Sequence, residues 1–311
     1  MRLGMKLGVQ ALRSIVLTIA ITLIGAAHSA MAQPLVTTGW VKDYIAKPDL
    51  VFLDIREESL YKVRHVYGAI NFPYQNDAWR VRPIGQNNPR RTEQLFDARM
   101  SELGITNESH VVLVHAGRMP ADVEAAAHIY WYFKLMGHEK ISIMDGGMVS
   151  LILDEGPVES RHRALATSDY KSKYNGLLIA RLSDVEAGVM GGAIFIDYRS
   201  TPYFLGIARL EDIARYGTIP NSKNLPADWF TTDSGGKIRP RVQLRKLYEL
   251  REIPFGLPHI AFSNTTERAA LGWFVAAEIL GNKNAQLYEG SIREWAANPK
   301  NKMYRQINLD E

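Results

Sequence analysis

The sequence has 311 residues, 46% of them hydrophobic and 23% charged, a composition typical of a globular protein long enough for two domains. It contains no cysteine, which excludes a thiolate nucleophile, a persulfide on cysteine and a thiolate metal site. None of the eight histidines has the H-x-x-x-H or H-E-x-x-H spacing, and the sequence predicts neither a metal site nor a cofactor.

Residues 1–32 have the pattern of a cleavable secretory signal. Arg2, Lys6 and Arg13 precede the acid-free apolar run SIVLTIAITLIGAA, and the small-residue site Ala30-Met31-Ala32 follows it. The alternative is an uncleaved membrane anchor, but the run is short for a bilayer and the small-residue site favours cleavage. We therefore expect a secreted protein, periplasmic if the source is a Gram-negative bacterium, with no membrane span after cleavage. Cleavage would lower the Lys+Arg count from 37 to 34, against 33 Asp+Glu, so the charge balance gives no argument for binding nucleic acid.

The rest of the chain consists of two similar halves. Each half contains an apolar run that ends in Asp-x-Arg, a second apolar run that enters a polar loop, and a long helical pattern stopped by glycine. The matching segments are LVFLDIR (50–56) with AIFIDYR (193–199), HVVLVHAG (110–117) with HIAFSNTT (259–266), and DVEAAAHIYWYFKLMG (122–137) with RAALGWFVAAEILG (268–281). Asp54 and Asp197 are 143 positions apart, a period that fits two tandem domains and is far too long for a solenoid.

Strands that alternate with helices predict an α/β fold in which each domain is a mainly parallel sheet flanked by helices. We place the first domain at residues 34–157 and the second at 177–305. The polar stretch VESRHRALATSDYKSKYNG (158–176) is the expected linker.

The order of these motifs resembles the tandem-domain rhodanese family of thiosulfate sulfurtransferases. Besides Asp-x-Arg, the resemblance rests on HVYGAINFP (65–73), TIPNSKNLP (218–226) and EGSIREW (289–295). In that family the first domain is usually non-catalytic. The second carries a Cys-x-x-x-x-Arg loop, whose cysteine takes the sulfane sulfur of thiosulfate and passes it to a thiophilic acceptor. The resemblance implies that the matching loop here is Ser263, Asn264, Thr265, Thr266, Glu267 and Arg268, with Ser263 at the cysteine position.

Three further positions depart from the family pattern. Tyr203 stands where active members usually carry a second substrate-binding arginine, and Thr218 stands where they usually have histidine. Glu267 brings a negative charge into a loop that would otherwise attract anions. The loop of the first half, HAGRMPAD (115–122), also lacks a nucleophile.

A serine at position 263 changes the chemistry that the loop can perform. Helix N-termini can lower the pKa of a cysteine from about 8.5 by several units, but a serine hydroxyl starts far higher and the loop has no His, Lys or Asp placed to take its proton. No G-x-S-x-G elbow surrounds Ser263, so the sequence does not predict a serine hydrolase either. We expect no sulfur transfer through this loop, and we expect Ser263 to cap the following helix.

The backbone N–H groups of such a loop form an anion-binding cup at a helix N-terminus regardless of the side chains. We therefore expect a small oxyanion to bind beside Ser263, Thr265 and Arg268. Arg199 is expected to approach the loop from Asp197-Tyr198-Arg199, its alternative role being an ion pair with Asp197 or Glu267.

Three functions remain open. The leading hypothesis is a secreted, non-catalytic rhodanese-like protein that binds a thiosulfate-like oxyanion or a protein partner. The second is an accessory of sulfur metabolism whose partner supplies the missing thiol. The third is an interaction scaffold with no small-molecule ligand.

Overall fold

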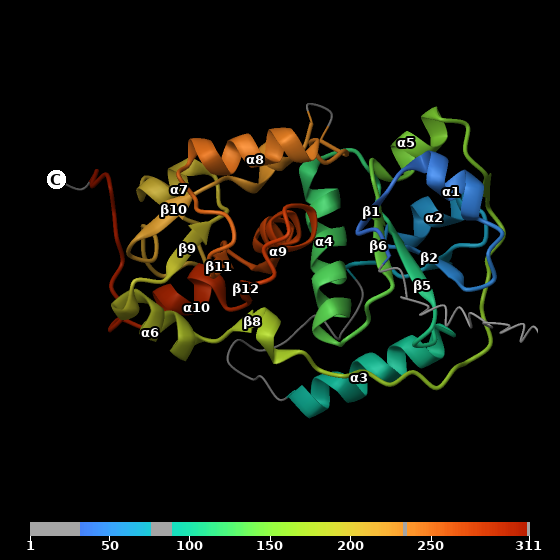
Figure 1. Ribbon diagram of the computed structural model, residues 1–311, viewed down its shortest axis with the longest axis horizontal. Helices are drawn as coiled ribbons and strands as arrows, with labels where there is room; N and C mark the ends of the chain where they lie inside the picture. The colour runs from blue at the N-terminus through green and yellow to red at the C-terminus, as the bar shows by residue number, and fades with distance from the viewer. Residues whose placement is uncertain (1–31, 76–88, 233–234, 310–311) are drawn as a thin grey trace, which may run out of the picture. The chain divides into compact units, whose positions relative to one another are not determined.

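Each half of the chain folds into a five-stranded parallel sheet with helices packed against it (Figure 1). The computed structural model describes residues 32–75, 89–232 and 235–309, which belong to one unit of the chain. The predicted α/β class and the two parallel sheets flanked by helices are thereby confirmed. The predicted secretory signal lies outside the described residues, apart from its final position.

The first half contains the first sheet and the helices around it. Its strands are β1 (Leu35–Val36), β2 (Leu50–Asp54), β4 (Ile70–Asn71), β5 (His110–Val114) and β6 (Ile141–Met144), and a short antiparallel pair is formed by β3 (His65–Val66) and β7 (Val158–Glu159). Its helices are α1 (Thr38–Tyr44), α2 (Glu58–Val63), α3 (Pro89–Glu102), α4 (Pro120–Leu135) and α5 (Gly147–Leu153).

The second half repeats this arrangement. Its strands are β8 (Ile179–Ala180), β9 (Ile194–Asp197), β10 (Ser222–Asn224), β11 (His259–Phe262) and β12 (Ala285–Tyr288). Its α-helices are α6 (Leu182–Gly191), α7 (Thr201–Leu205), α8 (Arg241–Leu250), α9 (Thr266–Phe274) and α10 (Ser291–Ala297), with the 3-10 turns η2 (Gly176–Leu178) and η3 (Ala227–Phe230) and the π-helical turn η4 (Val275–Ile279).

The two sheets have the same strand order, which demonstrates the internal repeat at the level of topology. The first sheet runs β1-β6-β5-β2-β4 and the second, in the matching direction, β8-β12-β11-β9-β10, with all neighbours parallel. The central strands read as continuous apolar runs because helices cover both faces of each sheet. β6 (ISIM) and β11 (HIAF), for example, are buried along their whole length.

Helices α4 and α9, the counterparts of each other in the two halves, pack directly together (Figure 1). The Tyr130 ring of α4 meets the Phe274 ring of α9 edge to face, with 4.8 Å between centroids. The Tyr130 hydroxyl also donates to Oε2 of Glu278 at 3.1 Å. This contact brings the loop that precedes α9 next to residues of the first half.

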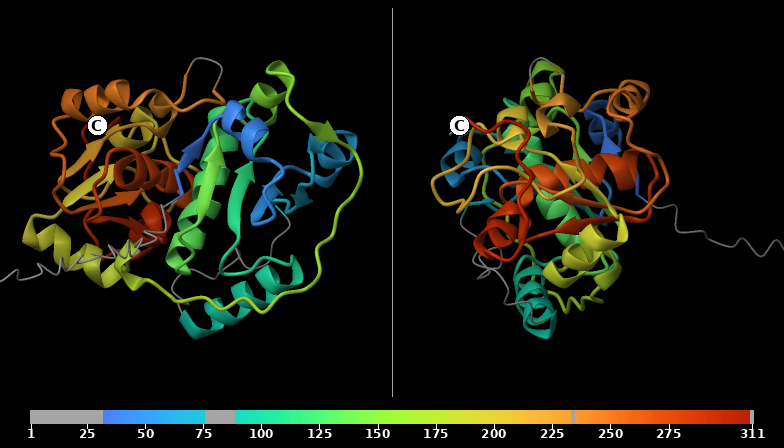
Figure 2. Two further views of the ribbon diagram at one scale, coloured as in Figure 1. Left: turned by 45° about the vertical axis from the view of Figure 1, so that its right-hand side comes forward. Right: turned by 90° about the vertical axis from the view of Figure 1, so that its left-hand side faces the viewer.

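The predicted linker is held along the first half. In Figure 2 it follows α3 as an extended chain, and its backbone N–H groups at Ser168 and Ser172 donate to the Ser101 carbonyl and to Asp97 at 2.9 and 2.7 Å. Tyr170, in the same segment, is fully buried. None of the helices within the described ranges combines the length and hydropathy needed to cross a membrane.

Candidate functional site

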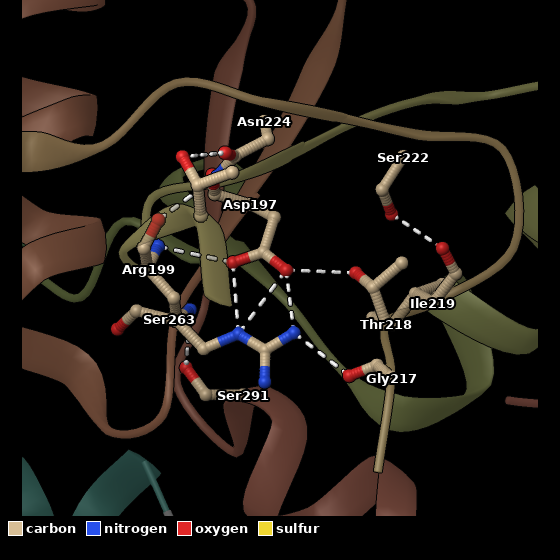
Figure 3. Close-up of polar contacts among 10 residues, drawn as sticks. Asp197, Arg199, Gly217, Thr218, Ile219, Ser222, Asn224, Ser263 and Ser291 are labelled. Atoms are coloured by element: carbon tan, nitrogen blue, oxygen red, sulfur yellow. Dashed lines mark hydrogen bonds and ion pairs between the residues drawn. The ribbon is translucent and has the colours of Figure 1, made fainter. Parts of the chain in front are cut away.

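The loop at the cysteine position of the resemblance connects β11 to α9, and its serine is locked in place by hydrogen bonds. Ser263 is 1% exposed, and its Oγ donates to the Thr265 carbonyl. Its backbone N–H donates to Oγ of Ser291 at 3.3 Å (Figure 3). That Oγ lies 3.0 Å from the same Thr265 carbonyl. Helix α9 begins at Thr266, and its N-cap residue is Thr265. The prediction that Ser263 caps this helix is therefore wrong, because the hydroxyl faces a carbonyl and not a helix N–H.

Glu267, the second residue of α9, places a carboxylate at the helix N-terminus. Its Oε2 accepts from the Thr265 hydroxyl at 2.6 Å, and its Oε1 accepts from the Tyr74 hydroxyl at 2.9 Å. Tyr74 also lies 2.8 Å from Nδ1 of His128. Burial acts to raise the pKa of Glu267, but the charge of His128 and hydrogen bonds from Thr265, its own N–H and Tyr74 outweigh burial and lower that pKa. An internal anion therefore lies where the loop was expected to attract a small one.

Arg268 reaches toward α4 of the first half. Its Nε lies 3.6 Å from Oε1 of Glu124, a carboxyl group that is 5% exposed. Burial raises the pKa of Glu124 to about 7; Arg268 opposes this effect, and Glu267 and Asp228 reinforce it. Near neutral pH this carboxyl group is therefore only partly ionised.

A cavity of about 650 Å³ lies between the two halves in front of this loop. That volume is within the range of sites for small molecules. Five of the six predicted loop residues line it, whereas the hydroxyl of Thr266 lies 3.3 Å from the Glu289 carbonyl. The remaining described lining residues come mainly from the first half: Ile55, Arg56, Glu57, Leu60, Tyr74, Gln75, His115, Ala116, Arg118, Met119, Ala121, Asp122, Glu124 and Ala125, with Tyr203 and Leu210 from the second.

Asp197 and Arg199 form a buried ion pair that does not belong to the cavity lining (Figure 3). Nε of Arg199 lies 2.9 Å from Oδ1 of Asp197, and Nη2 donates to Oδ2 at 2.6 Å and to the Gly217 carbonyl at 2.9 Å. The Thr218 hydroxyl completes the group with a bond to Asp197 at 2.7 Å. The ion pair considered for Arg199 is therefore observed with Asp197, and its partner is not Glu267.

In the first half, too, an acidic side chain accepts hydrogen bonds at the N-terminus of the helix that follows the loop, here α4. Oδ2 of Asp122, the third residue of that helix, accepts from the backbone N–H groups of Arg118 and Met119 at 2.7 and 3.1 Å. Both central helices therefore begin with an acidic side chain that binds donors of its own loop region. The charge at each helix N-terminus is compensated from within the chain.

Sequence reasoning missed the side chains that the first half contributes to the site: Tyr74, Glu124 and His128. One signal was available, because Glu124 and His128 are polar residues one helical turn apart in the otherwise apolar DVEAAAHIYWYF. Both are buried in the structure. Buried polar residues at this spacing indicate a polar contact across a helix interface. Which residue they would meet could not be predicted without the packing of α4 on α9.

Known proteins resemble the chain in sequence over most of its length. The rhodanese-like domain family matches residues 37–153. A protein of Mycolicibacterium smegmatis named "Putative thiosulfate sulfurtransferase" is 30% identical over 280 residues, covering 86% of this chain and 96% of that protein. The chain belongs to the thiosulfate sulfurtransferase family. Another member of this set, the "Sulfur carrier protein TtuD" of Thermus thermophilus, is 28% identical over 88% of this chain and 95% of its own.

Solved structures agree with the tandem rhodanese fold. Escherichia coli SseA, described as a 3-mercaptopyruvate sulfotransferase, superposes with a TM-score of 0.69 at 23% identity over 84% of this chain and 99% of its own. Tum1 of Saccharomyces cerevisiae gives a TM-score of 0.72 at 19% identity, and the match covers 88% of this chain and 98% of Tum1. The chain is thus a tandem rhodanese of the sulfurtransferase family in which no position of the sequence is cysteine.

Proposed function

We propose that this tandem rhodanese does not transfer sulfur through its second-half loop and acts as a binding protein. The observation that carries the proposal is the Ser263 hydroxyl, at the position that the resemblance matches to the family's cysteine, which donates to the Thr265 carbonyl. A hydroxyl held in this way has no partner that could take its proton: the hydrogen bonds described for Ser263 involve only the Thr265 carbonyl, Ser291 Oγ and the N–H of Ile292.

The geometry at the helix N-terminus supports the same conclusion. A thiolate or a bound oxyanion would gain stabilisation from the N–H groups there, but the Glu267 carboxylate already lies at that position. A second negative group nearby would be repelled at a site that is largely shielded from water. The loop therefore favours neither an ionised nucleophile nor a strongly held anion.

The ligand of the binding protein would enter the cavity between the halves. The small-oxyanion hypothesis relies on Arg268, since the hydroxyls of Ser263 and Thr265 donate within the loop. A protein partner, including one that supplies the missing thiol, is the alternative, and a scaffold without a ligand is the third. Residues 1–32 favour export, so we propose that binding takes place outside the cytoplasm.

A sulfur-transfer assay tests the loss of catalysis. The purified chain is incubated with thiosulfate and cyanide, and thiocyanate is followed over time against a protein-free control. The proposal predicts no formation above that control. Turnover that depends on protein concentration would contradict it. Ser263→Ala is the matched variant, because any turnover that it retains cannot come from the hydroxyl.

A further inference from the structure

The described lining of the cavity carries an excess of negative charge when Glu124 is ionised. Its acidic side chains are Glu57, Asp122, Glu124 and Glu267, and its basic ones are Arg56, Arg118 and Arg268. One of the three guanidinium groups is already engaged, since Arg56 pairs with the buried Asp54 behind the cavity wall, with Nη2 at 2.5 Å from Oδ2. The field inside this cavity therefore favours a cation over an anion.

The four carboxylates differ in how well their oxygens are satisfied. Asp122 accepts hydrogen bonds from its own loop region, and Glu267 accepts from Thr265 of its loop and from Tyr74 of the first half. Glu124 is 5% exposed, and within the part of the chain that the structure describes its Oε1 accepts no hydrogen bond. The nearest cationic nitrogen, Nε of Arg268, lies 3.6 Å away, beyond hydrogen-bond distance.

A second acceptor belongs to the same cavity lining. Oδ1 of Asn264 is buried and has no hydrogen-bond partner among the described residues. A buried oxygen without a donor is costly, roughly 1–3 kcal/mol for a neutral group and more for a charged one. Two such oxygens in one cavity wall call for a ligand that brings N–H donors.

We infer that the cavity binds a small organic cation of the amine or guanidinium class, whose N–H groups donate to Glu124. The inference rests on the proposed function, since it names the ligand class for the same cavity. A cation satisfies the free Oε1 and is attracted by Glu267, whereas a thiosulfate-like oxyanion faces both carboxylates. Arg268 then competes with the ligand for Glu124.

The inference is tested by calorimetric titration of the purified chain with four probes. Agmatine and benzylamine are cations, benzyl alcohol is the neutral counterpart of benzylamine, and thiosulfate represents the oxyanion. We expect both cations to bind more tightly than benzyl alcohol and thiosulfate. Failure of both cations to bind, or tighter binding of thiosulfate, would overturn the inference.

Two substitutions locate the binding. Glu124→Gln keeps the size of the side chain and should weaken agmatine binding about tenfold or more. Arg268→Gln should tighten it, because the competing cation is removed; an oxyanion would respond in the opposite direction. Unchanged agmatine affinity in Glu124→Gln would contradict the assignment.

Asp169→Asn is the charge control. It removes one carboxylate from an exposed pair with Lys171, remote from the cavity lining, and should leave affinity unchanged. Circular dichroism confirms that each variant is folded. A failed titration overturns only the ligand class, whereas thiocyanate formation in the assay above would overturn the proposed function.

Discussion

Position 263 determines what the loop can do as a chemical group. The family reaction needs a sulfur atom that ionises and then carries a second sulfur, and an oxygen atom does neither at ordinary pH. In the structure the hydroxyl donates to the Thr265 carbonyl. The sequence was sufficient for the chemical conclusion, but the partner of the hydroxyl could be known only from the fold of the loop.

Restoring the cysteine tests whether that atom is sufficient. Ser263→Cys alone should yield little sulfur transfer from thiosulfate to cyanide, because the negative charge of Glu267 still opposes a thiolate. In addition, Tyr203 stands where active members usually carry a substrate-binding arginine. Adding Tyr203→Arg should raise kcat/KM by more than the product of the single effects, since both groups act on one transition state. Tyr203 lines the cavity, so its replacement can face the same substrate. Full family-like activity of the single variant would contradict this expectation.

Glu124 makes the stability of the protein depend on pH. Burial raises the pKa of Glu124 from its ordinary value of 4.5 to about 7. The charge of Arg268 opposes this rise, and the charges of Glu267 and Asp228 add to it. The folded state therefore binds the proton of the Glu124 carboxyl more tightly than the unfolded state does. Protonated Glu124 stabilises the fold below pH 4.5, and this stabilisation is lost as pH rises through 7. Glu124→Gln should be more stable than the native chain at pH 8 by about 3 kcal/mol. The difference should shrink toward pH 4.5.

Urea unfolding at pH 4.5, 6 and 8 measures this dependence. Asp169→Asn, which removes an exposed carboxylate, should show no comparable pH effect. A Glu124→Gln variant that is less stable than the native chain at pH 8 would show that the contact with Arg268 outweighs the burial of the charge.

At the scale of the elements, hydrophobic pattern and glycine positions were good predictors. The apolar runs at 50–56, 110–117, 193–199 and 259–266 all became parallel strands, and the helical patterns at 122–137 and 268–281 became α4 and α9 with η4. The contact between α4 and α9 was not predictable, because a helix that is apolar all round shows no preferred face. For the same reason the contributions of Glu124 and His128, both on α4, were missed.

Gly272 permits α9 to approach the second sheet. A Cβ at this position would lie 2.3 Å from the Tyr198 ring, which is fully buried and held by a 2.9 Å contact between its hydroxyl and that of Tyr248. Gly272→Ala should therefore destabilise the protein by about 1–3 kcal/mol despite the better helix propensity of alanine.

Gly191 in α6 is the matched control for this substitution. A Cβ there meets nothing within 4 Å, so Gly191→Ala should be neutral or slightly stabilising. Both variants are compared by denaturant unfolding. Equal effects at the two positions would show that helix propensity, and not the contact with Tyr198, decides the outcome.

At the scale of the whole molecule, the repeat and its order were predictable, but the way the halves share one cavity was not. Asp54-x-Arg56 and Asp197-x-Arg199 look equivalent in sequence and form equivalent ion pairs. Only Arg56 lines the cavity. This difference between Arg56 and Arg199 arises from the packing of one half against the other. The residues of the two Asp-x-Arg motifs do not indicate it.

Three buried histidines predict that the protein loses stability in acid. Burial lowers the pKa values of His115, His138 and His259 from 6.5 to about 4 each. As pH falls, the unfolded chain therefore takes up these protons at a higher pH than the folded chain does. The free energy of unfolding that is present above pH 6.5 is lost as pH falls toward 4, by about 3 kcal/mol for each histidine. Glu124 contributes to the pH dependence with the opposite sign, and its contribution offsets roughly that of one histidine. Urea unfolding should give a lower free energy at pH 4.5 than at pH 7, and an equal or higher value would contradict the prediction.

The most direct test of the central claim is the intact mass of the mature chain after incubation with thiosulfate. If a cysteine-free loop cannot hold the transferred atom, the mass stays that of the unmodified protein, with or without a thiol acceptor. An increase by one sulfur atom, lost on Ser263→Ala, would show that the loop carries sulfur after all.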